Sequence, residues 1–322
     1  MRAIIVNEDS VGLQELDEGF LPDEPVTVDV HYSDLNYKDA LAVTGRPGVV
    51  RQRPLIAGID LVGTVRTSSD ERFTPGQWIV LNGAGLSETR HGGYTTLAHI
   101  DPSLAVALPE GFSPTDAAAL GTAGYTAALA VLRLVMEGCT PDQGPVLVTG
   151  ATGGVGSVAT MLLASAGFEV AALTGRADEF GDYLRSLGAQ QVVGRDEFGA
   201  TGRPLQKALY AGVVDSVGGV VLANAIARTI PGGTVAACGL AGSADLPASV
   251  MPFILRGVTL AGIDSVWADA DDRADAWRVL DRGVDRGLLS AMTRTIGLDD
   301  VIAAGQQLLD GRLHGRTLVE VR

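Results

Sequence analysis

The stretch VLVTGATGGVGSVATMLLASAGFEVAALTGR, residues 146–176, has the residue types and spacing to bind a phosphate group. It consists of an apolar strand, a glycine cluster, a helix and a second apolar strand. Glycines let the chain turn tightly and let backbone N–H groups approach a pyrophosphate at the positive end of the following helix. The glycines of this turn are Gly150, Gly153, Gly154 and Gly156. The order of the elements predicts a dinucleotide-binding turn.

The end of the second strand bears on which dinucleotide binds. NAD sites usually place Asp or Glu there to accept the ribose hydroxyls, whereas this chain has Thr174, Gly175 and Arg176. An arginine pairs well with a 2′-phosphate, and a threonine hydroxyl can donate to it, so we expect NADPH as the cofactor. Arg195, just beyond the third strand, is a second candidate for the phosphate or the adenine. Asp178 and Glu179 follow closely, so the alternative is that one of their carboxylates binds the ribose hydroxyls, as in an NAD site.

The elements around this turn indicate two domains. Residues 1–115 contain short alternating strands with turn residues between them, typical of an antiparallel barrel or folded sheet. Residues 116–266 alternate apolar strands with helices, which predicts a doubly wound parallel sheet, and residues 267–322 return to the first domain. The fold class is therefore α/β, with a Rossmann-type domain and a β-rich domain. The apolar segment VTLAGID, residues 258–264, is expected at a sheet edge, where a second copy would pair with it as a homodimer.

Composition limits the partners and the compartment. The net charge of −14 over 322 residues argues against nucleic acid or an anionic membrane, since both repel an acidic surface. Cys139 and Cys238 lie too far apart in sequence for a disulfide framework, which favours a reducing compartment. No apolar stretch reaches the ~20 residues that span a bilayer, and the N-terminal segment predicts a strand and not a signal peptide. We expect a cytoplasmic protein.

Taken together, the β-rich first domain, the glycine turn and the returning C-terminus resemble the medium-chain dehydrogenase/reductase superfamily. Zinc alcohol dehydrogenases of that superfamily carry a ligand cysteine and a ligand histidine where this chain has Asn36 and Ile59. An amide and a butyl group cannot replace thiolate and imidazole on Zn²⁺, and two cysteines cannot form a four-cysteine lobe. We expect a zinc-independent enzyme with a GroES-like catalytic domain and no metal.

Several segments narrow the resemblance to the acrylyl-CoA reductase branch, whose members are also called quinone oxidoreductases. The most specific are PFILRGV, followed by GIDSV, and the closing GRTLVEV. The resemblance implies NADPH-dependent reduction of the C=C bond of a small α,β-unsaturated acyl-CoA, acrylyl-CoA to propionyl-CoA first. Reduction of quinones on the same fold is the alternative, and a non-catalytic regulator that binds NADPH is a second one. The residues that the resemblance places at the dinucleotide are Tyr37, Val155, Gly156, Ser157, Thr174, Gly175, Arg176, Arg195, Leu240, Ile254 and Ser265.

Without a metal, catalysis depends on hydrogen-bond donors placed where enolate charge develops on the thioester oxygen. Asn36 is the first candidate donor, through its side-chain amide. Tyr37 is expected to pack on the nicotinamide or to donate to its ribose. The proton for the α-carbon can come from water. Arg46, Arg51 and Arg53 form the densest basic cluster of the N-terminal half and are candidates for the CoA phosphates, with three solvated loop arginines as the alternative.

Overall fold

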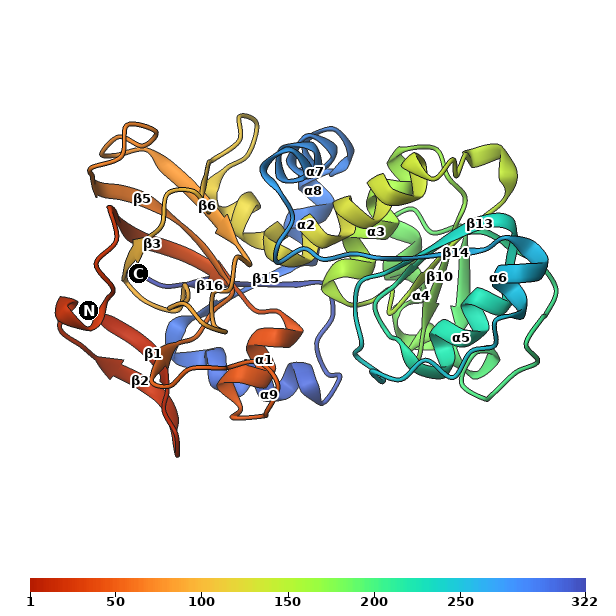
Figure 1. The fold of residues 1–322 in the computed structure, drawn as a ribbon, viewed down its shortest axis with the longest axis horizontal. Coiled ribbons are helices and arrows are strands. Elements are labelled where there is room, and N and C mark those ends of the chain that lie inside the picture. The colour runs from red at the N-terminus through yellow and green to blue at the C-terminus, as the bar shows by residue number, and fades with distance from the viewer. The chain divides into compact units, whose positions relative to one another are not determined.

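The computed structural model describes the whole chain, residues 1–322 (Figure 1). It divides into two compact units. The first comprises residues 1–122 and 289–322, and the second comprises residues 123–288. The first unit contains two sheets and the second contains one, and each unit has its own hydrophobic core.

The chain returns to the first unit at residue 289, later than the residue 267 of our sequence prediction. The segment between these positions belongs to the second unit because helix α7 (Ala270–Gly283) packs on α3 (Gly154–Ser165). Gly283 lies directly against Leu162, with no room for a side chain between them.

The first unit contains a seven-stranded sheet and a three-stranded sheet. The strands of the larger sheet are β3 (Val26–Asp34), β5 (Asp60–Ser68), β6 (Trp78–Asn82), β7 (Leu97–Ile100), β8 (Val106–Ala107), β15 (Thr293–Gly297) and β16 (Arg316–Glu320). Those of the smaller sheet are β1 (Arg2–Val6), β2 (Val11–Glu15) and β4 (Leu55–Ile56). All pairs are antiparallel except β15 with β16, so the predicted antiparallel folded sheet is confirmed, with one parallel pair at its edge.

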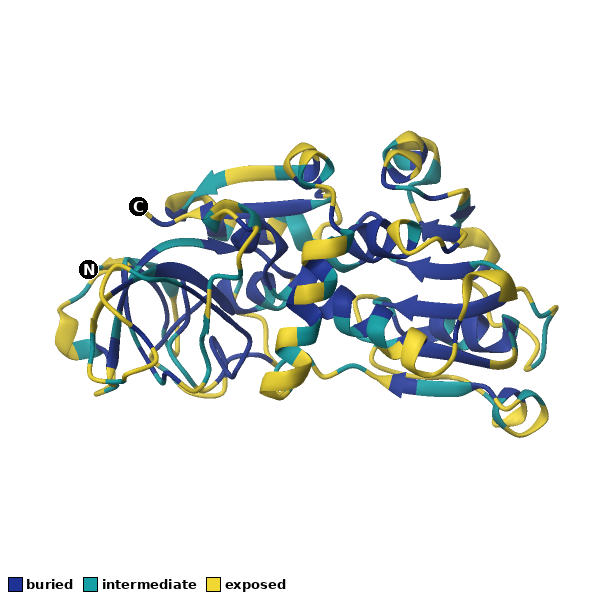
Figure 2. Cartoon of the chain, turned by 90° about the horizontal axis from the view of Figure 1, so that it is seen from above, coloured by how far each residue is buried: buried dark blue, intermediate teal, exposed yellow.

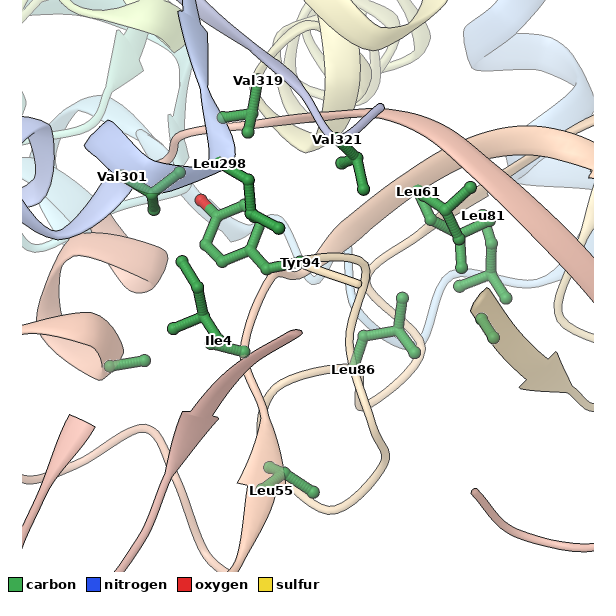
Figure 3. Packing of buried hydrophobic residues seen from close by; sticks show 14 of the residues in the cluster. Ile4, Leu55, Leu61, Leu81, Leu86, Tyr94, Leu298, Val301, Val319 and Val321 are labelled. Atoms are coloured by element: carbon green, nitrogen blue, oxygen red, sulfur yellow. The ribbon is translucent and has the colours of Figure 1, made fainter. Parts of the chain in front are cut away.

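The apolar and polar residues that alternate along β3 lie on opposite faces of the strand, as predicted. Val26, Val28 and Val30 are fully buried, while Thr27 and Asp29 on the other face are half-buried. The last strand, β16, pairs with the end of β3, so residues from the two ends of the chain are neighbours in this sheet. Figure 3 shows the core beneath the sheet, where the ring of Tyr94 lies among Ile4, Leu298 and Val301.

Two helices of the first unit pack on each other. They are α1 (Tyr37–Val43) and α9 (Val301–Leu309). Gly305 of α9 lies against Ala40 and Val43 of α1, so the helices approach closely at this point. Helix α1 begins directly after the end of β3, which fixes the loop of Asn36 between a sheet strand and a helix.

Helix α2 (Pro114–Met136) crosses from the first unit to the second and is broken at Gly121, whose φ of 48° lies in the left-handed region. Ser113 and Asp116 exchange hydrogen bonds at its start, as in a capping box. By length and composition α2 could cross a membrane, but 67% of its most apolar window is buried within the protein, as in a core helix. The helix is longer than the apolar run seen in the sequence because it extends beyond that run in both directions.

The second unit is a six-stranded parallel sheet in the order β11-β10-β9-β12-β13-β14, the doubly wound order predicted from the strand–helix alternation. The apolar strands are buried and the outer faces of the helices are exposed (Figure 2). As expected, β14 lies at the edge. The strands are β9 (Val146–Thr149), β10 (Val170–Thr174), β11 (Gln191–Gly194), β12 (Tyr210–Asp215), β13 (Thr229–Ala237) and β14 (Thr259–Gly262). The remaining helices are α4 (Ala177–Ser186), α5 (Gly219–Arg228), α6 (Met251–Arg256) and, leading into the first unit, α8 (Arg286–Met292).

Candidate functional site

The glycine turn between β9 and α3 is closed by backbone contacts that exclude side chains. Gly150 has a φ of 58°, which favours glycine. A Cβ on Gly156 would overlap the carbonyl oxygen of Gly150 and lie 2.6 Å from Cα of Ala151. The helix therefore starts directly against the turn, and its first N–H groups are left open toward a ligand. A turn of this geometry is suited to a pyrophosphate, and the role of its glycines stays a prediction.

The turn lies at the point where strand order reverses, between β9 and β12, where doubly wound sheets bind their ligands. Asp215, at the end of β12, accepts hydrogen bonds from the Thr149 hydroxyl at 2.6 Å and from the backbone N–H of Gly218 at 2.8 Å. Burial raises the pKa of Asp215 above its usual range, and these hydrogen bonds oppose that shift. The carboxyl group thus ties together the ends of the two central strands beside the turn.

The end of β10 gathers hydroxyl and guanidinium groups. Thr174 is buried, and its Oγ1 accepts from the backbone N–H of Arg176 at 3.2 Å. Nη2 of Arg176 lies 3.3 Å from Oγ1 of Thr152, and its guanidinium stands 4.4 Å from the centre of the Phe180 ring. A Cβ on Gly175 would lie 3.1 Å from Cζ of Arg195, so both predicted arginines are next to this strand end.

A second hydrogen-bond chain supports the turn from α4. The hydroxyl of Tyr183 donates to Oγ of Ser157 at 2.8 Å, and Ser157 donates to the carbonyl oxygen of Ala151 at 3.2 Å. Ser157, in the first turn of α3, is fully buried, so this contact is internal to the second unit. It links the helix after β10 with the glycine turn after β9.

The other dinucleotide residues predicted for the second unit are more exposed. The side chains of Leu240 and Ile254 are 58% and 72% exposed, and Val155 and Ser265 are half-buried. Their surfaces are open to a ligand, but no contact within the unit brings them to the cluster at the end of β10. Their roles stay predictions.

In the first unit, Asn36 lies at the centre of a buried polar cluster. Its Nδ2 donates to Asp34 Oδ1 at 3.1 Å and to Asp60 Oδ2 at 2.9 Å, and its Oδ1 accepts from Arg316 Nη2 at 3.2 Å. Asn36 is 9% exposed. Both hydrogens of the amide are therefore used within the protein.

Asp60 and Arg316 hold this cluster together. Asp60 also accepts from Nδ2 of Asn82 at 2.8 Å and from the hydroxyl and backbone N–H of Thr122 at 2.6 and 2.9 Å. Arg316, only 2% exposed, pairs with the carboxylate of Asp34 and donates to the carbonyl oxygen of Ala119. Burial and the nearby Asp60 charge raise the pKa of Asp34 well above its usual range, and Arg316 opposes that shift.

Asp39 anchors the loop from the other side. Its oxygens accept from the backbone N–H of Asn36 at 2.9 Å and of Ile59 at 2.8 Å. Burial, followed by the charge of Asp60, raises the pKa of Asp39 to about 7. Lys38 forms an ion pair with Glu88, while Tyr37 stands at the start of α1 with 40% of its surface exposed.

The three arginines proposed for CoA have different neighbours. Arg46 is exposed, and Arg51, 71% exposed at its side chain, lies 3.7 Å from the Glu88 carboxylate. Arg53 lines a cavity of about 450 Å³ together with Glu8 and Asp9 of the β1–β2 hairpin. An acidic group thus lies close to the guanidinium group of Arg51, and two acidic residues line the same cavity as Arg53.

Sequence reasoning missed several groups in these clusters. Thr152 stands inside the glycine turn and carries a hydroxyl where the motif demands no particular side chain. Tyr183 sits three residues after Phe180, one turn along α4, on the same face as the strand end. Asp34, Asp60 and Arg316 are charged residues at the ends of strands that are otherwise largely buried. Asp60, between Ile59 and Leu61, carries the clearest signal, because a charge among apolar residues of a buried strand needs a partner.

Comparison with known proteins places the chain in a family. A family model described as alcohol dehydrogenase GroES-like domain matches residues 22–132, and one described as zinc-binding dehydrogenase matches residues 154–281. Acrylyl-CoA reductase AcuI of Ruegeria pomeroyi is 48% identical over 99% of this chain and 98% of its own length. The chain belongs to the medium-chain dehydrogenase/reductase superfamily. It is an oxidoreductase of the branch that contains AcuI.

Two further relatives show how this superfamily member compares with its branch. A Bacillus subtilis protein described as "Putative quinone oxidoreductase YhfP" is 41% identical over 97% of this chain and 95% of its own length. The crystal structure of YHDH from Escherichia coli K-12 with bound NADPH has a TM-score of 0.97 and 44% identity, covering 100% of both chains. The predicted family and fold class, a GroES-like unit with a Rossmann-type unit, are confirmed.

Proposed function

We propose that the protein reduces the carbon–carbon double bond of acrylyl-CoA with NADPH, forming propionyl-CoA. The observation that carries this proposal is the likeness to AcuI along nearly the whole chain, at 48% identity. The cluster at the end of β10 supports the choice of cofactor, because two guanidinium groups and two hydroxyls suit a 2′-phosphate better than a pair of ribose hydroxyls.

NADPH, when bound, supplies the hydride that reaches the β-carbon of the substrate. In this proposal the glycine turn holds the pyrophosphate, while Thr174, Gly175, Arg176 and Arg195 hold the 2′-phosphate. Gly175 contributes by leaving space for Arg195 beside the strand end. The remaining proposed contacts to the cofactor are Tyr37, Val155, Ser157, Leu240, Ile254 and Ser265.

Reduction leaves negative charge on the thioester oxygen, which hydrogen-bond donors must stabilise. Asn36 is the first candidate donor from the sequence, and both of its amide hydrogens are directed at Asp34 and Asp60. To act on substrate, the amide would have to exchange one of these carboxylates for the enolate oxygen. We therefore propose that Asn36 chiefly positions the loop before Tyr37, with water supplying the proton for the α-carbon.

Quinone reduction is the second candidate, and the likeness to YhfP favours it. It would use the same cofactor site and no CoA-binding arginines. The two are separated by measuring the loss of absorbance of NADPH with acrylyl-CoA and, in parallel, with a simple benzoquinone. Fast, saturable turnover of acrylyl-CoA with little use of NADH supports the proposal. Turnover of quinone alone would replace it, and binding of NADPH with no turnover of any enoyl-CoA, enone or quinone would support a regulator.

Arg46, Arg51 and Arg53 are proposed to attract the CoA phosphates. In the double variant R51Q/R53Q, KM for acrylyl-CoA should rise while turnover of quinone stays unchanged. The variant R72Q is a matched control, since Arg72 is an exposed arginine paired locally with Asp70. Equal effects of the double variant on both substrates would remove the CoA role from these arginines.

We further propose a cytoplasmic homodimer. Strand β14 leaves one edge of its sheet unpaired within the chain, and an unpaired edge favours pairing with a second copy. Val250 and Leu255, beside this edge strand in sequence, are 66% and 60% exposed, which suits an apolar contact. The mass in solution tests this proposal, and a monomer at working concentration would refute it.

A further inference from the structure

Thr152 connects the glycine turn with the end of β10. Its Oγ1 lies 3.4 Å from Oγ1 of Thr174 and 3.3 Å from Nη2 of Arg176. Both threonines are nearly buried, at 6% and 3% exposed. A side chain that contacted only the pyrophosphate would not need to lie beside Thr174 and Arg176. The position of the Thr152 hydroxyl therefore points to the ribose end of the cofactor.

The contact with Thr152 restrains Arg176. The guanidinium has the Thr152 hydroxyl as one neighbour and the face of the Phe180 ring, 4.4 Å from its carbon, as another. A free arginine side chain loses rotamer freedom when it binds an anion, and that loss lowers affinity. An arginine already held in place binds the same anion with a smaller loss.

The hydroxyl can also reach the anion itself. A threonine hydroxyl carries one hydrogen and two lone pairs. When Thr152 accepts from Arg176, its hydrogen is free to point at Thr174 or at a phosphate oxygen. Thr174 already accepts from the backbone N–H of Arg176, so the two hydroxyls and the arginine form one connected donor group.

We propose that Thr152 is a specificity-determining residue for NADPH over NADH, which acts mainly by positioning Arg176 for the 2′-phosphate. The inference rests on the proposed 2′-phosphate site at the end of β10. It predicts an effect confined to the phosphorylated cofactor, because NADH has no group at that place. If Thr152 had a purely structural role in the turn, its replacement would weaken the binding of both NADPH and NADH, since both need the pyrophosphate cradle.

The test measures Kd of NADPH and NADH for the full chain by the fluorescence of the bound reduced nicotinamide, without substrate. In T152V, which keeps the shape and loses the hydroxyl, Kd for NADPH should rise about tenfold, which is about 1.4 kcal/mol, while Kd for NADH stays within about twofold. T152S should restore NADPH binding. The competitor 2′-phospho-AMP should lose affinity in T152V and AMP should not. T152A replaces T152V if the latter does not fold.

Further variants test the role of Thr152 separately from the proposed 2′-phosphate site at the end of β10. R176Q should weaken NADPH binding selectively. T152V/R176Q should bind NADPH at most about twofold more weakly than R176Q alone, because Thr152 acts mainly through the arginine. Y183F is the matched control, since Tyr183 supports the pyrophosphate turn through Ser157 and should affect both cofactors equally. If R176Q does not discriminate, the proposed 2′-phosphate site is wrong. If R176Q discriminates and T152V weakens both cofactors equally or neither, the inference about Thr152 is overturned.

Discussion

Asn36 donates from its side-chain amide to the carboxylate of Asp60 across 2.9 Å, inside a cluster that solvent barely reaches. A second bond from the same nitrogen goes to Asp34 at 3.1 Å. A hydrogen bond to a charged group contributes about 1.5–3 kcal/mol, more than a neutral one. The amide is therefore a strong structural connection, and its release toward a substrate would carry a comparable cost.

Replacing Asn36 should destabilise the fold. In N36A, two buried carboxylates each lose a donor, and we expect the free energy of unfolding to fall by about 2–4 kcal/mol. Urea denaturation measures this. The control N7A removes an amide with one long, exposed hydrogen bond and should change stability by less than about 0.5 kcal/mol. Unchanged stability of N36A with a large loss of kcat would instead restore Asn36 as the direct donor to the enolate.

Arg316 is the buried cation of the same cluster, and its loss should cost more. R316M leaves Asp34 without its guanidinium partner, and removal of one member of a buried pair costs about 3–5 kcal/mol. R316K keeps the charge with fewer donors and should fall between R316M and the unmodified protein. Arg2 forms a similar pair with Asp299 at the exposed surface, so R2M should cost at most about 1 kcal/mol in the same assay. Equal losses for R2M and R316M would contradict the role of burial.

The arrangement of the strands can be predicted from local sequence patterns, but the buried polar cluster around Asn36 and Arg316 cannot. Alternation over Val26–Val30 and the glycine spacing after Thr149 are properties of neighbouring residues, so the sheets and the turn could be predicted. Arg316 and Asp34 are 282 positions apart and meet only because β16 pairs with β3. No local sequence pattern predicts that strand pairing, so the sequence alone does not show that the Asn36 amide is hydrogen-bonded within the protein.

Contacts between residues distant in sequence also explain single positions that local patterns leave unexplained. Helix α2 is broken at Gly121, where the backbone passes so close to the carboxylate of Asp34 that a Cβ would overlap it. The contact is again between distant residues, so the sequence showed a glycine in a helical pattern without the reason for it. Thr152 and Thr174, 22 positions apart, also meet only through the folding of β10 beside the turn.

Stability should depend on the protonation of Asp39. Burial and the charge of Asp60 raise its pKa from 3.8 to about 7. The folded protein thus binds this proton more tightly than the unfolded chain, and the stabilisation is complete below the unfolded pKa and is lost as pH rises through the folded value. The shift corresponds to about 4 kcal/mol, lost between about pH 4 and pH 7.

The measurement is the free energy of unfolding against pH for the protein and for D39N. The ionisable groups that interact with Asp39 are the carboxylates of Asp60 and Asp34 and the hydroxyl of Tyr94. D39N cannot titrate, so its stability should fall less between pH 4 and pH 7 than that of the unmodified protein. Parallel curves for the two proteins would show that Asp39 is ionised across this range and that its two backbone hydrogen bonds outweigh burial.

Gly175 should control which cofactor binds. Its backbone is outside the left-handed region, so a side chain is tolerated there. The atoms nearest to an added Cβ would belong to the flexible end of Arg195, at 3.1 Å. In G175D, the new carboxylate repels a 2′-phosphate and accepts from ribose hydroxyls, the arrangement of NAD sites. We expect Kd for NADPH to rise more than tenfold and Kd for NADH to fall. G175A displaces Arg195 slightly without adding charge and should change both constants by less than about threefold, roughly 0.6 kcal/mol. If G175A weakens NADPH as strongly as G175D, space for Arg195 governs selectivity and the charge at this position does not.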